Sequence, residues 1–229
     1  QSDDNERYKL VFREKNDVFG ATSSDALHWD VINEPLLVNY HADTHNQFMY
    51  DESKGKYIGY WRGWEPHGTT MGRRTIAYAE TENFRKWPHP KTIVSPDIYD
   101  SPSTDIYTNS YSPWPNSNAH LMFPCMFERD TDLLEMHLMT SRDGLTWNRI
   151  SRDPIVPSGR ASTGEDTSIY GGAGLINVNP GEWALPISPQ SITHNQALYP
   201  EALRNVRPHG TICLASWRED GWTSIEAKS

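Results

Sequence analysis

Three acidic positions open successive strand-like segments of the sequence, and carboxyl groups are the side chains that acid–base chemistry uses most directly. They are Asp43 in HADTHN, Asp105 in STDIYTN, and Glu165 with its neighbour Asp166 in GEDTSIYG. Hydrolysis of a glycosidic bond needs one carboxylic acid to protonate the leaving oxygen and one carboxylate as base or nucleophile. A third carboxylate nearby raises the pKa of the acid by like-charge repulsion. The alternative is that Asp43 and Asp105 only cap strand entries and turns.

Two histidines flank the first of these carboxylates. His41, Asp43 and His45 alternate with period two, so in a strand they would share one face. This spacing also suits a metal ion, but no third nitrogen or sulfur ligand is apparent in the sequence. We therefore expect His45 to orient a substrate, and we expect no metal ion or other cofactor.

Arg62 ends the strand-like segment YIGYWR and stands between Trp61 and Trp64. Indole rings stack on the apolar faces of sugar rings, and a guanidinium donates hydrogen bonds beside them, so these three residues are candidates for substrate binding. The alternative is that the aromatic rings pack between neighbouring sheets. Further residues expected to line the same cavity are Tyr107, Asn109, Asp166 and Tyr170.

A repeat of about 60 residues determines where these candidates should lie. Trp29, Trp87 and Trp147 end the segments SSDALHW, TENFRKW and SRDGLTW, and they are 58 and 60 residues apart. A Ser or Thr stands six positions before each tryptophan, and an Asp or Asn stands four before it. These side chains bond to the backbone of tight turns, so we expect a structural role for the motif. A fourth, degenerate copy contains Ser216 and Trp222.

Three strand-like segments precede most of these turns, and a short outer strand follows them. Four antiparallel strands per repeat form the blade of a β-propeller, so we predict an all-β propeller with four-stranded antiparallel blades. Carboxylates at equivalent positions of consecutive blades would then converge on one central cavity. The segment 189–208 breaks the pattern and is expected to be a long loop. We predict one domain over residues 1–229, with blade units near 1–40, 41–100, 101–160 and 161–229, the first without its innermost strand.

The turns resemble the Asp-box turns of sialidase-type propellers. The segments ERYKLVF, DTHNQFMYDESKGKYIGYWR and GRRTIAYAETENFRKW resemble the five-bladed propellers of glycoside hydrolase families 32, 43 and 117. This resemblance implies a glycosidase that degrades an oligo- or polysaccharide, with Asp43, Asp105 and Glu165 as catalytic carboxylates in a central funnel. The WMNDPNG-like segment of family 32 is absent from the sequence. The alternative is a propeller that binds carbohydrate or serves as a scaffold without catalysis.

Composition argues against nucleic acid and a membrane as partners, and the resemblance implies a carbohydrate. The formal net charge of −9 argues against a nucleic-acid partner, because a phosphate-binding surface needs clustered Lys and Arg. The mean hydropathy is −0.71, and no apolar run approaches the roughly 20 residues that cross a membrane. Cys125 and Cys213 lie in apolar strand-like segments and are expected to be free thiols. A secreted or periplasmic location is favoured although no signal peptide is visible, and the sequence defines no oligomeric state.

Overall fold

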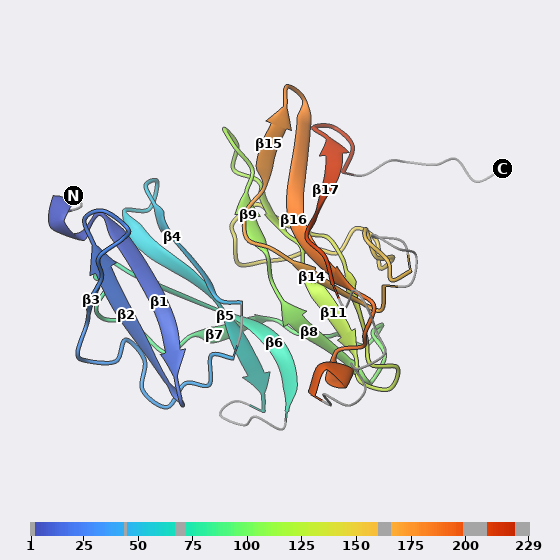
Figure 1. The fold of residues 1–229 in the computed structure, drawn as a ribbon, viewed down its shortest axis with the longest axis horizontal. Helices are drawn as coiled ribbons and strands as arrows, with labels where there is room; N and C mark the ends of the chain where they lie inside the picture. The colour runs from blue at the N-terminus through green and yellow to red at the C-terminus, as the bar shows by residue number, and fades with distance from the viewer. Residues whose placement is uncertain (1–2, 44, 67–71, 160–165, 199–209, 223–229) are drawn as a thin grey trace. The chain divides into compact units, whose positions relative to one another are not determined.

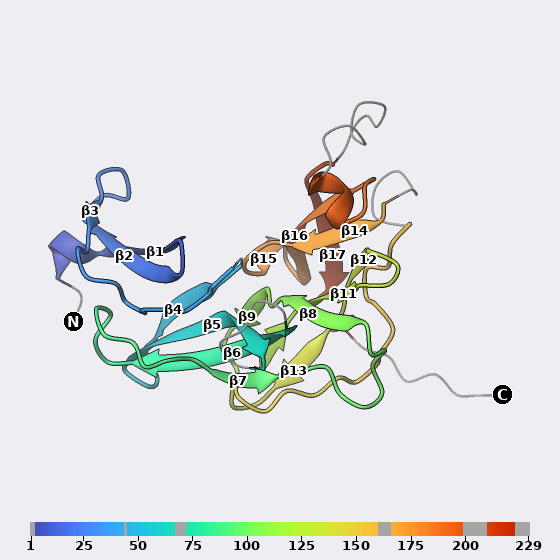
Figure 2. The ribbon, with the colours of Figure 1, turned by 90° about the horizontal axis from the view of Figure 1, so that it is seen from below.

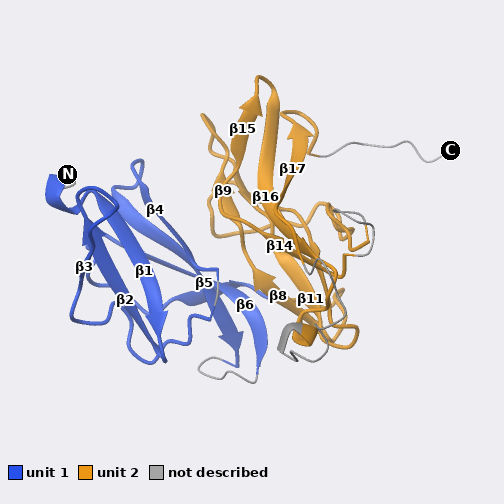
Figure 3. Cartoon of the chain, viewed as in Figure 1, with its two compact units in different colours: residues 1–95 blue, residues 96–229 orange. Residues whose placement is uncertain are grey.

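The computed structural model describes residues 3–43, 45–66, 72–159, 166–198 and 210–222, and nearly all of its regular elements are β-strands (Figures 1 and 2). Within these residues the only helices are two single 3₁₀ turns, Asp4–Glu6 and Asn195–Leu198. No helix of the described chain is long and apolar enough to cross a membrane. The prediction of an all-β protein is therefore confirmed. The chain divides into two compact units, residues 1–95 and 96–229 (Figure 3), which are described in turn.

Unit 1 contains two antiparallel sheets. The first has three strands in the order β1 (Tyr8–Glu14), β2 (Asp17–Ser23) and β3 (Asp30–Val31). The second is a meander in sequence order, formed by β4 (Gln47–Asp51), β5 (Lys56–Glu65), β6 (Arg73–Thr81) and β7 (Lys91–Val94). The central strands β5 and β6 each contain a run of consecutive buried residues, 58–64 and 75–79, as expected for strands that are covered on both faces.

Unit 2 contains one larger and one smaller sheet. The larger has the order β15-β16-β14-β12-β11-β8, with β17 also paired to β16. Its strands are β8 (Thr104–Thr108), β11 (Cys125–Glu128), β12 (Leu133–Met136), β14 (Ser168–Gly171), β15 (Ile176–Asn179), β16 (Glu182–Gln190) and β17 (Cys213–Arg218). The smaller sheet has the order β13-β10-β9, formed by β9 (Tyr111–Pro113), β10 (His120–Met122) and β13 (Met139–Ser141).

Two stretches of unit 2 each contain two strands. Residues 105–113 form β8 and β9, which belong to different sheets, and residues 167–178 form β14 and β15. Between β8 and β9 the backbone of Ser110 is left-handed, with φ 43°, a conformation that a continuous strand does not contain. Cys125 and Cys213 are free thiols, as expected.

The three repeated tryptophans lie in turns with one common hydrogen bond. In each turn the indole N–H donates to the carbonyl oxygen three residues earlier, over 3.2 Å for Trp29, 2.8 Å for Trp87 and 3.1 Å for Trp147. In the first and third copies a serine hydroxyl accepts the backbone N–H three residues later, over 2.9 Å in both. These contacts are local, so each turn closes through its own side chains.

The fourth copy of the motif has a different structure. Ser216 lies within β17 and is paired with Ala184 of β16. Trp222 packs its ring against Trp217 at 5.1 Å and Phe123 at 5.7 Å. The degenerate sequence therefore forms an aromatic cluster in unit 2.

The equivalent tryptophans differ in burial, and this difference predicts different contributions to stability. Trp87 is 8% exposed and contacts the rings of Phe48 and Trp61, whereas Trp29 is half-buried. We expect Trp87→Ala to destabilise unit 1 by about 3–5 kcal/mol, and Trp29→Ala by about 1–2 kcal/mol. Urea unfolding of both variants tests this. Equal losses of unfolding free energy in the two variants would show that the turn, rather than core packing, determines how much each tryptophan stabilises the protein.

His137 in unit 2 predicts a loss of stability in mild acid. Burial, followed by the charge of Arg149, lowers its pKa to about 4 from the ordinary 6.5. Between these values the unfolded chain binds more protons than the folded chain, so stability falls as pH drops from about 7 to about 4, by up to roughly 3 kcal/mol. Unfolding midpoints of the wild type and His137→Gln across this range test the assignment. The variant should lose much of the pH dependence, while His89→Gln, at an exposed position, should retain it.

Candidate functional site

The described residues 40–43, 45 and 46, which precede β4, position the candidate residues of unit 1. They do not form a strand, because Ala42 N–H donates to Tyr40 O over 2.8 Å and Asp43 N–H donates to His41 O over 3.0 Å, which closes two three-residue turns. His45 follows with a left-handed φ of 60°. The prediction that His41, Asp43 and His45 share one strand face is therefore wrong, since this backbone has no pleat.

Asp43 and Arg62 form the central ion pair of this segment. Arg62 Nη1 donates to Asp43 Oδ2 over 2.5 Å, with the Arg62 side chain 1% exposed and that of Asp43 31% exposed. Tyr40 OH donates to Arg62 O over 2.7 Å, and Arg62 N–H donates to Asn46 Oδ1 over 2.8 Å. The buried guanidinium thus holds an accessible carboxylate, and the segment around it is hydrogen-bonded to the Arg62 backbone.

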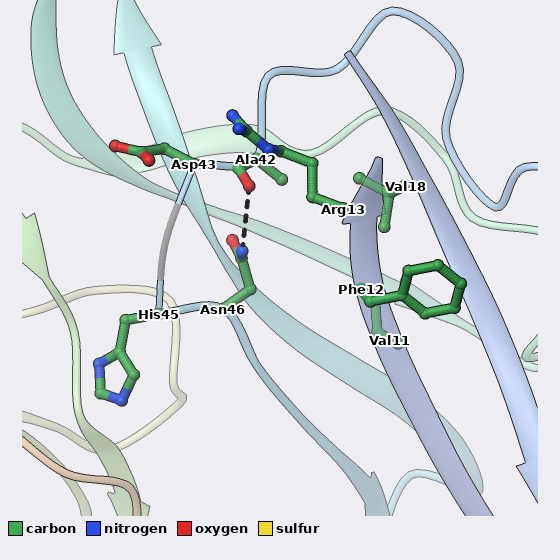
Figure 4. Close-up of a pocket in the computed structure, with 8 residues that line it drawn as sticks. All are labelled: Val11, Phe12, Arg13, Val18, Ala42, Asp43, His45 and Asn46. Carbon is green, nitrogen blue, oxygen red and sulfur yellow. Dashed lines mark hydrogen bonds between the residues drawn. The ribbon is translucent and has the colours of Figure 1, made fainter. Parts of the chain in front are cut away.

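A pocket of about 250 Å³ opens beside this carboxylate (Figure 4). The volume lies just below the roughly 300–1,000 Å³ of common small-molecule pockets, so it suits one sugar ring rather than a longer ligand. Its polar lining is Arg13, Asp43, His45 and Asn46. Its apolar lining is Val11, Phe12, Val18 and Ala42.

His45 lines the pocket and is mostly buried. Burial, followed by the positive charge of Arg62, lowers its pKa, so the neutral imidazole is favoured. In Figure 4 its ring points away from Arg13. A neutral imidazole has one donor and one acceptor nitrogen, which suits hydrogen bonding to sugar hydroxyl groups.

The two tryptophans beside Arg62 have different surroundings. Trp61 is completely buried, with the rings of Phe48, Trp87 and Tyr40 at 4.5, 5.5 and 5.9 Å. Its ring belongs to the core of unit 1, so we exclude Trp61 from the proposed binding residues. Trp64 is 8% exposed and lies among charged groups.

Asp105, on β8 of unit 2, is held more tightly than Asp43. Its side chain is 0% exposed, and its two oxygens accept hydrogen bonds from Arg129 Nε over 2.9 Å and Nη2 over 2.8 Å. Pairing of β8 with β11 sets Asp105 opposite Phe127, two residues from Arg129. This two-pronged contact fixes the carboxylate and makes it less available for proton transfer.

Two predicted tyrosines of unit 2 meet a histidine that the sequence analysis did not select. Tyr107 packs its ring 4.5 Å from that of His194, and Tyr170 OH lies 2.8 Å from His194 Nδ1. Burial raises the pKa of Tyr170, so the phenol keeps its proton. Asp132 O accepts the backbone N–H of His194 over 3.2 Å, which ties this segment to the sheet. A His–Tyr pair of this kind can donate and accept hydrogen bonds with a polar ligand.

The remaining predicted residues have structural contacts or lie outside the described chain. Asn109 is 2% exposed, and its Oδ1 accepts the Tyr111 N–H over 3.1 Å, which supports the turn after β8. Asp166 is 3% exposed, and its carbonyl oxygen accepts the Gly159 N–H. Glu165 falls outside the described residues. Across the described ranges, no group of three His, Cys, Asp or Glu side chains could hold a metal ion.

Several solved structures resemble the chain in fold. A thermostable family-43 glycoside hydrolase aligns with a TM-score of 0.59 and 14% identity over 93% of this chain and 68% of its own. A GH32 beta-fructofuranosidase from Bombyx mori aligns with a TM-score of 0.57 and 12% identity, over 90% and 42%. An N-acetylgalactosamine deacetylase from F. plautii, in complex with blood group B trisaccharide, aligns with a TM-score of 0.53 and 14% identity, over 76% and 54%.

The protein has an all-β fold of the β-propeller type. No known family profile matches the sequence, and no curated protein matches it. The chain spans about half the length of the deacetylase and less than half that of the fructofuranosidase. At these identities the similarity defines the fold alone, and hydrolases and a deacetylase share it, so the chemistry must be argued from the site.

The structural role of the Asp105–Arg129 pair can be tested by measuring its contribution to the stability of unit 2. Arg129→Met should destabilise unit 2 by about 3 kcal/mol, because it leaves a carboxylate buried without its guanidinium. Arg129→Met with Asp105→Asn should recover part of this loss, which urea unfolding measures as a double-mutant cycle. Arg142→Met, at an exposed position, is the control. No coupling in the cycle would mean that the pair does not stabilise the fold.

Proposed function

We propose that the protein is a glycosidase that hydrolyses a glycosidic bond of an oligo- or polysaccharide. The observation that carries the proposal is Asp43, an accessible carboxylate held by the buried guanidinium of Arg62 at a pocket of about 250 Å³. A similar fold in glycoside hydrolases supports the assignment. Hydrolysis needs such a positioned carboxylate and a second carboxyl group as proton donor.

We assign different roles to the three candidate carboxyl groups. Asp43 acts as base or nucleophile, because part of its side chain reaches the pocket while Arg62 fixes its direction. Asp105 acts as a fixed negative charge, since both of its oxygens accept hydrogen bonds from Arg129. Glu165 is the proposed proton donor, on the strength of its position in the repeat and the resemblance of the sequence to glycosidases.

A carbohydrate-binding propeller without catalysis is the second candidate. The observation that favours it is Asp105, which is fully buried and engaged by Arg129. If Asp43 is also used only to hold its segment in place, the pocket would bind a sugar without cleaving it.

Kinetics of matched variants test the proposal. The intact protein is assayed on a panel of aryl glycosides and of neutral and acidic oligosaccharides. Asp43→Asn and Glu165→Gln should each lower kcat by about 10²–10⁴, the usual contribution of one acid–base group. Asp30→Asn, the same change at an exposed aspartate of β3, should leave kcat unchanged.

The outcomes separate the two candidates. Turnover that Asp43→Asn and Glu165→Gln leave intact would contradict the catalytic assignment. Sugar binding that Asp43→Asn weakens, with no turnover by the wild type, would support the binding protein.

A further inference from the structure

Arginine side chains gather around Trp64 in unit 1, although the protein has a net charge of −9. The guanidinium carbons of Arg62 and Arg74 lie 5.5 and 5.3 Å from the centre of the Trp64 ring. Trp64 Nε1 donates to His41 O over 2.9 Å, and the two rings lie 5.5 Å apart. Arg13 adds a third guanidinium beside His41. Arg13, Arg62 and Arg74 are called the arginine cluster below.

Arg13 is the member of the cluster that is exposed to solvent. Its Nη1 lies 3.4 Å from both ring nitrogens of His41, so the guanidinium lies against the imidazole in a contact longer than a strong hydrogen bond. In the described chain Arg13 forms no ion pair, while Arg62 is paired with Asp43. A guanidinium has five N–H donors, so Arg13 keeps donors for a ligand.

His41 reports the local electrostatic field. Burial is the first cause that lowers its pKa, and the charges of Arg13, Arg62 and Arg74 lower it further. The negative charge of Asp43 acts in the opposite direction, with a smaller effect than the charge of Arg13. The field at His41 is therefore positive, in contrast to the negative charge of the whole protein.

We propose that the arginine cluster binds the anionic group of an acidic sugar, a ring-borne carboxylate or sulfate ester. Arg13, which lines the pocket, donates hydrogen bonds to the anion directly. Arg62 and Arg74 do not line the pocket and contribute positive charge near it. This inference rests on the proposed function, since it names the substrate class of the same site.

The position of Arg13 links the anion to the candidate catalytic carboxylate. Arg13 and Asp43 line the same pocket (Figure 4). One bound sugar can therefore place its anionic group at Arg13 and its ring at Asp43. A guanidinium matches the two oxygens of a carboxylate or sulfate with two parallel N–H groups. A neutral sugar has no anionic group that could accept these two hydrogen bonds.

Calorimetric titration tests the proposal with defined ligands. The intact protein is titrated with oligogalacturonate, with a sulfated galactan oligosaccharide and with a neutral galactan oligosaccharide of equal length. At low salt the wild type should bind at least one acidic ligand about tenfold more tightly than the neutral one, and added salt should reduce this preference. The two acidic ligands distinguish carboxylate from sulfate.

A matched pair of variants assigns the effect to the cluster. Arg13→Gln should remove most of the preference for the acidic ligand, while Arg142→Gln, the same charge change at an exposed position of unit 2, should retain it. Equal affinity of the wild type for acidic and neutral ligands would overturn the inference, as would equal losses in both variants. Acidic preference without turnover of any ligand would contradict only the proposed hydrolysis, and turnover of neutral sugars without acidic preference would contradict only this inference.

Discussion

The ion pair between Arg62 and Asp43 is the interaction on which the candidate site of unit 1 depends. A guanidinium that is 1% exposed is stable only where a partner compensates its charge, and Asp43 supplies that partner. Asn46 and Tyr40 bond to the Arg62 backbone, so the segment that carries Asp43 is tied to this one residue of β5 by three bonds. The pairing required by one buried arginine thus fixes the conformation of residues 40–43, 45 and 46, which have no regular structure and which contribute four residues to the lining of the pocket.

The same pairing of arginine with aspartate has a different consequence in unit 2. Asp105 is the buried member there and Arg129 is partly exposed, whereas in unit 1 the arginine is buried and the aspartate accessible. The exposed partner is the one that can meet a ligand. The two pairs thus differ in which partner is buried. We infer a catalytic role for Asp43, which is accessible, and the role of a fixed charge for Asp105, which is buried.

Local features of this protein could be predicted from its sequence, and long-range ones could not. The all-β class followed from strand-like segments and the repeated turns, where Ser23 and Asp25 bond within three residues of themselves. Asp43 and Arg62 were both selected by residue type, and they meet. Arg129 was missed because 16 residues, including β9 and β10, intervene between β8 and its partner strand β11, so the register could not be deduced. His194 was missed because it lies in a segment without periodicity, where its contacts with Tyr107 and Tyr170 depend on tertiary structure.

Burial also explains why equal residue types in the sequence have unequal roles. Trp61 and Trp64 flank Arg62 on β5, and the period of two places Trp64 on the face of Arg62 and Trp61 on the opposite face. The two faces differ in what each ring meets: Trp61 meets three aromatic rings, whereas Trp64 meets two guanidinium groups and an imidazole. An indole holds cations against its face at little cost, because the ring carries negative charge density there. Trp64 can therefore keep like-charged arginines close together, and a positive field persists at one site of a protein whose total charge is negative.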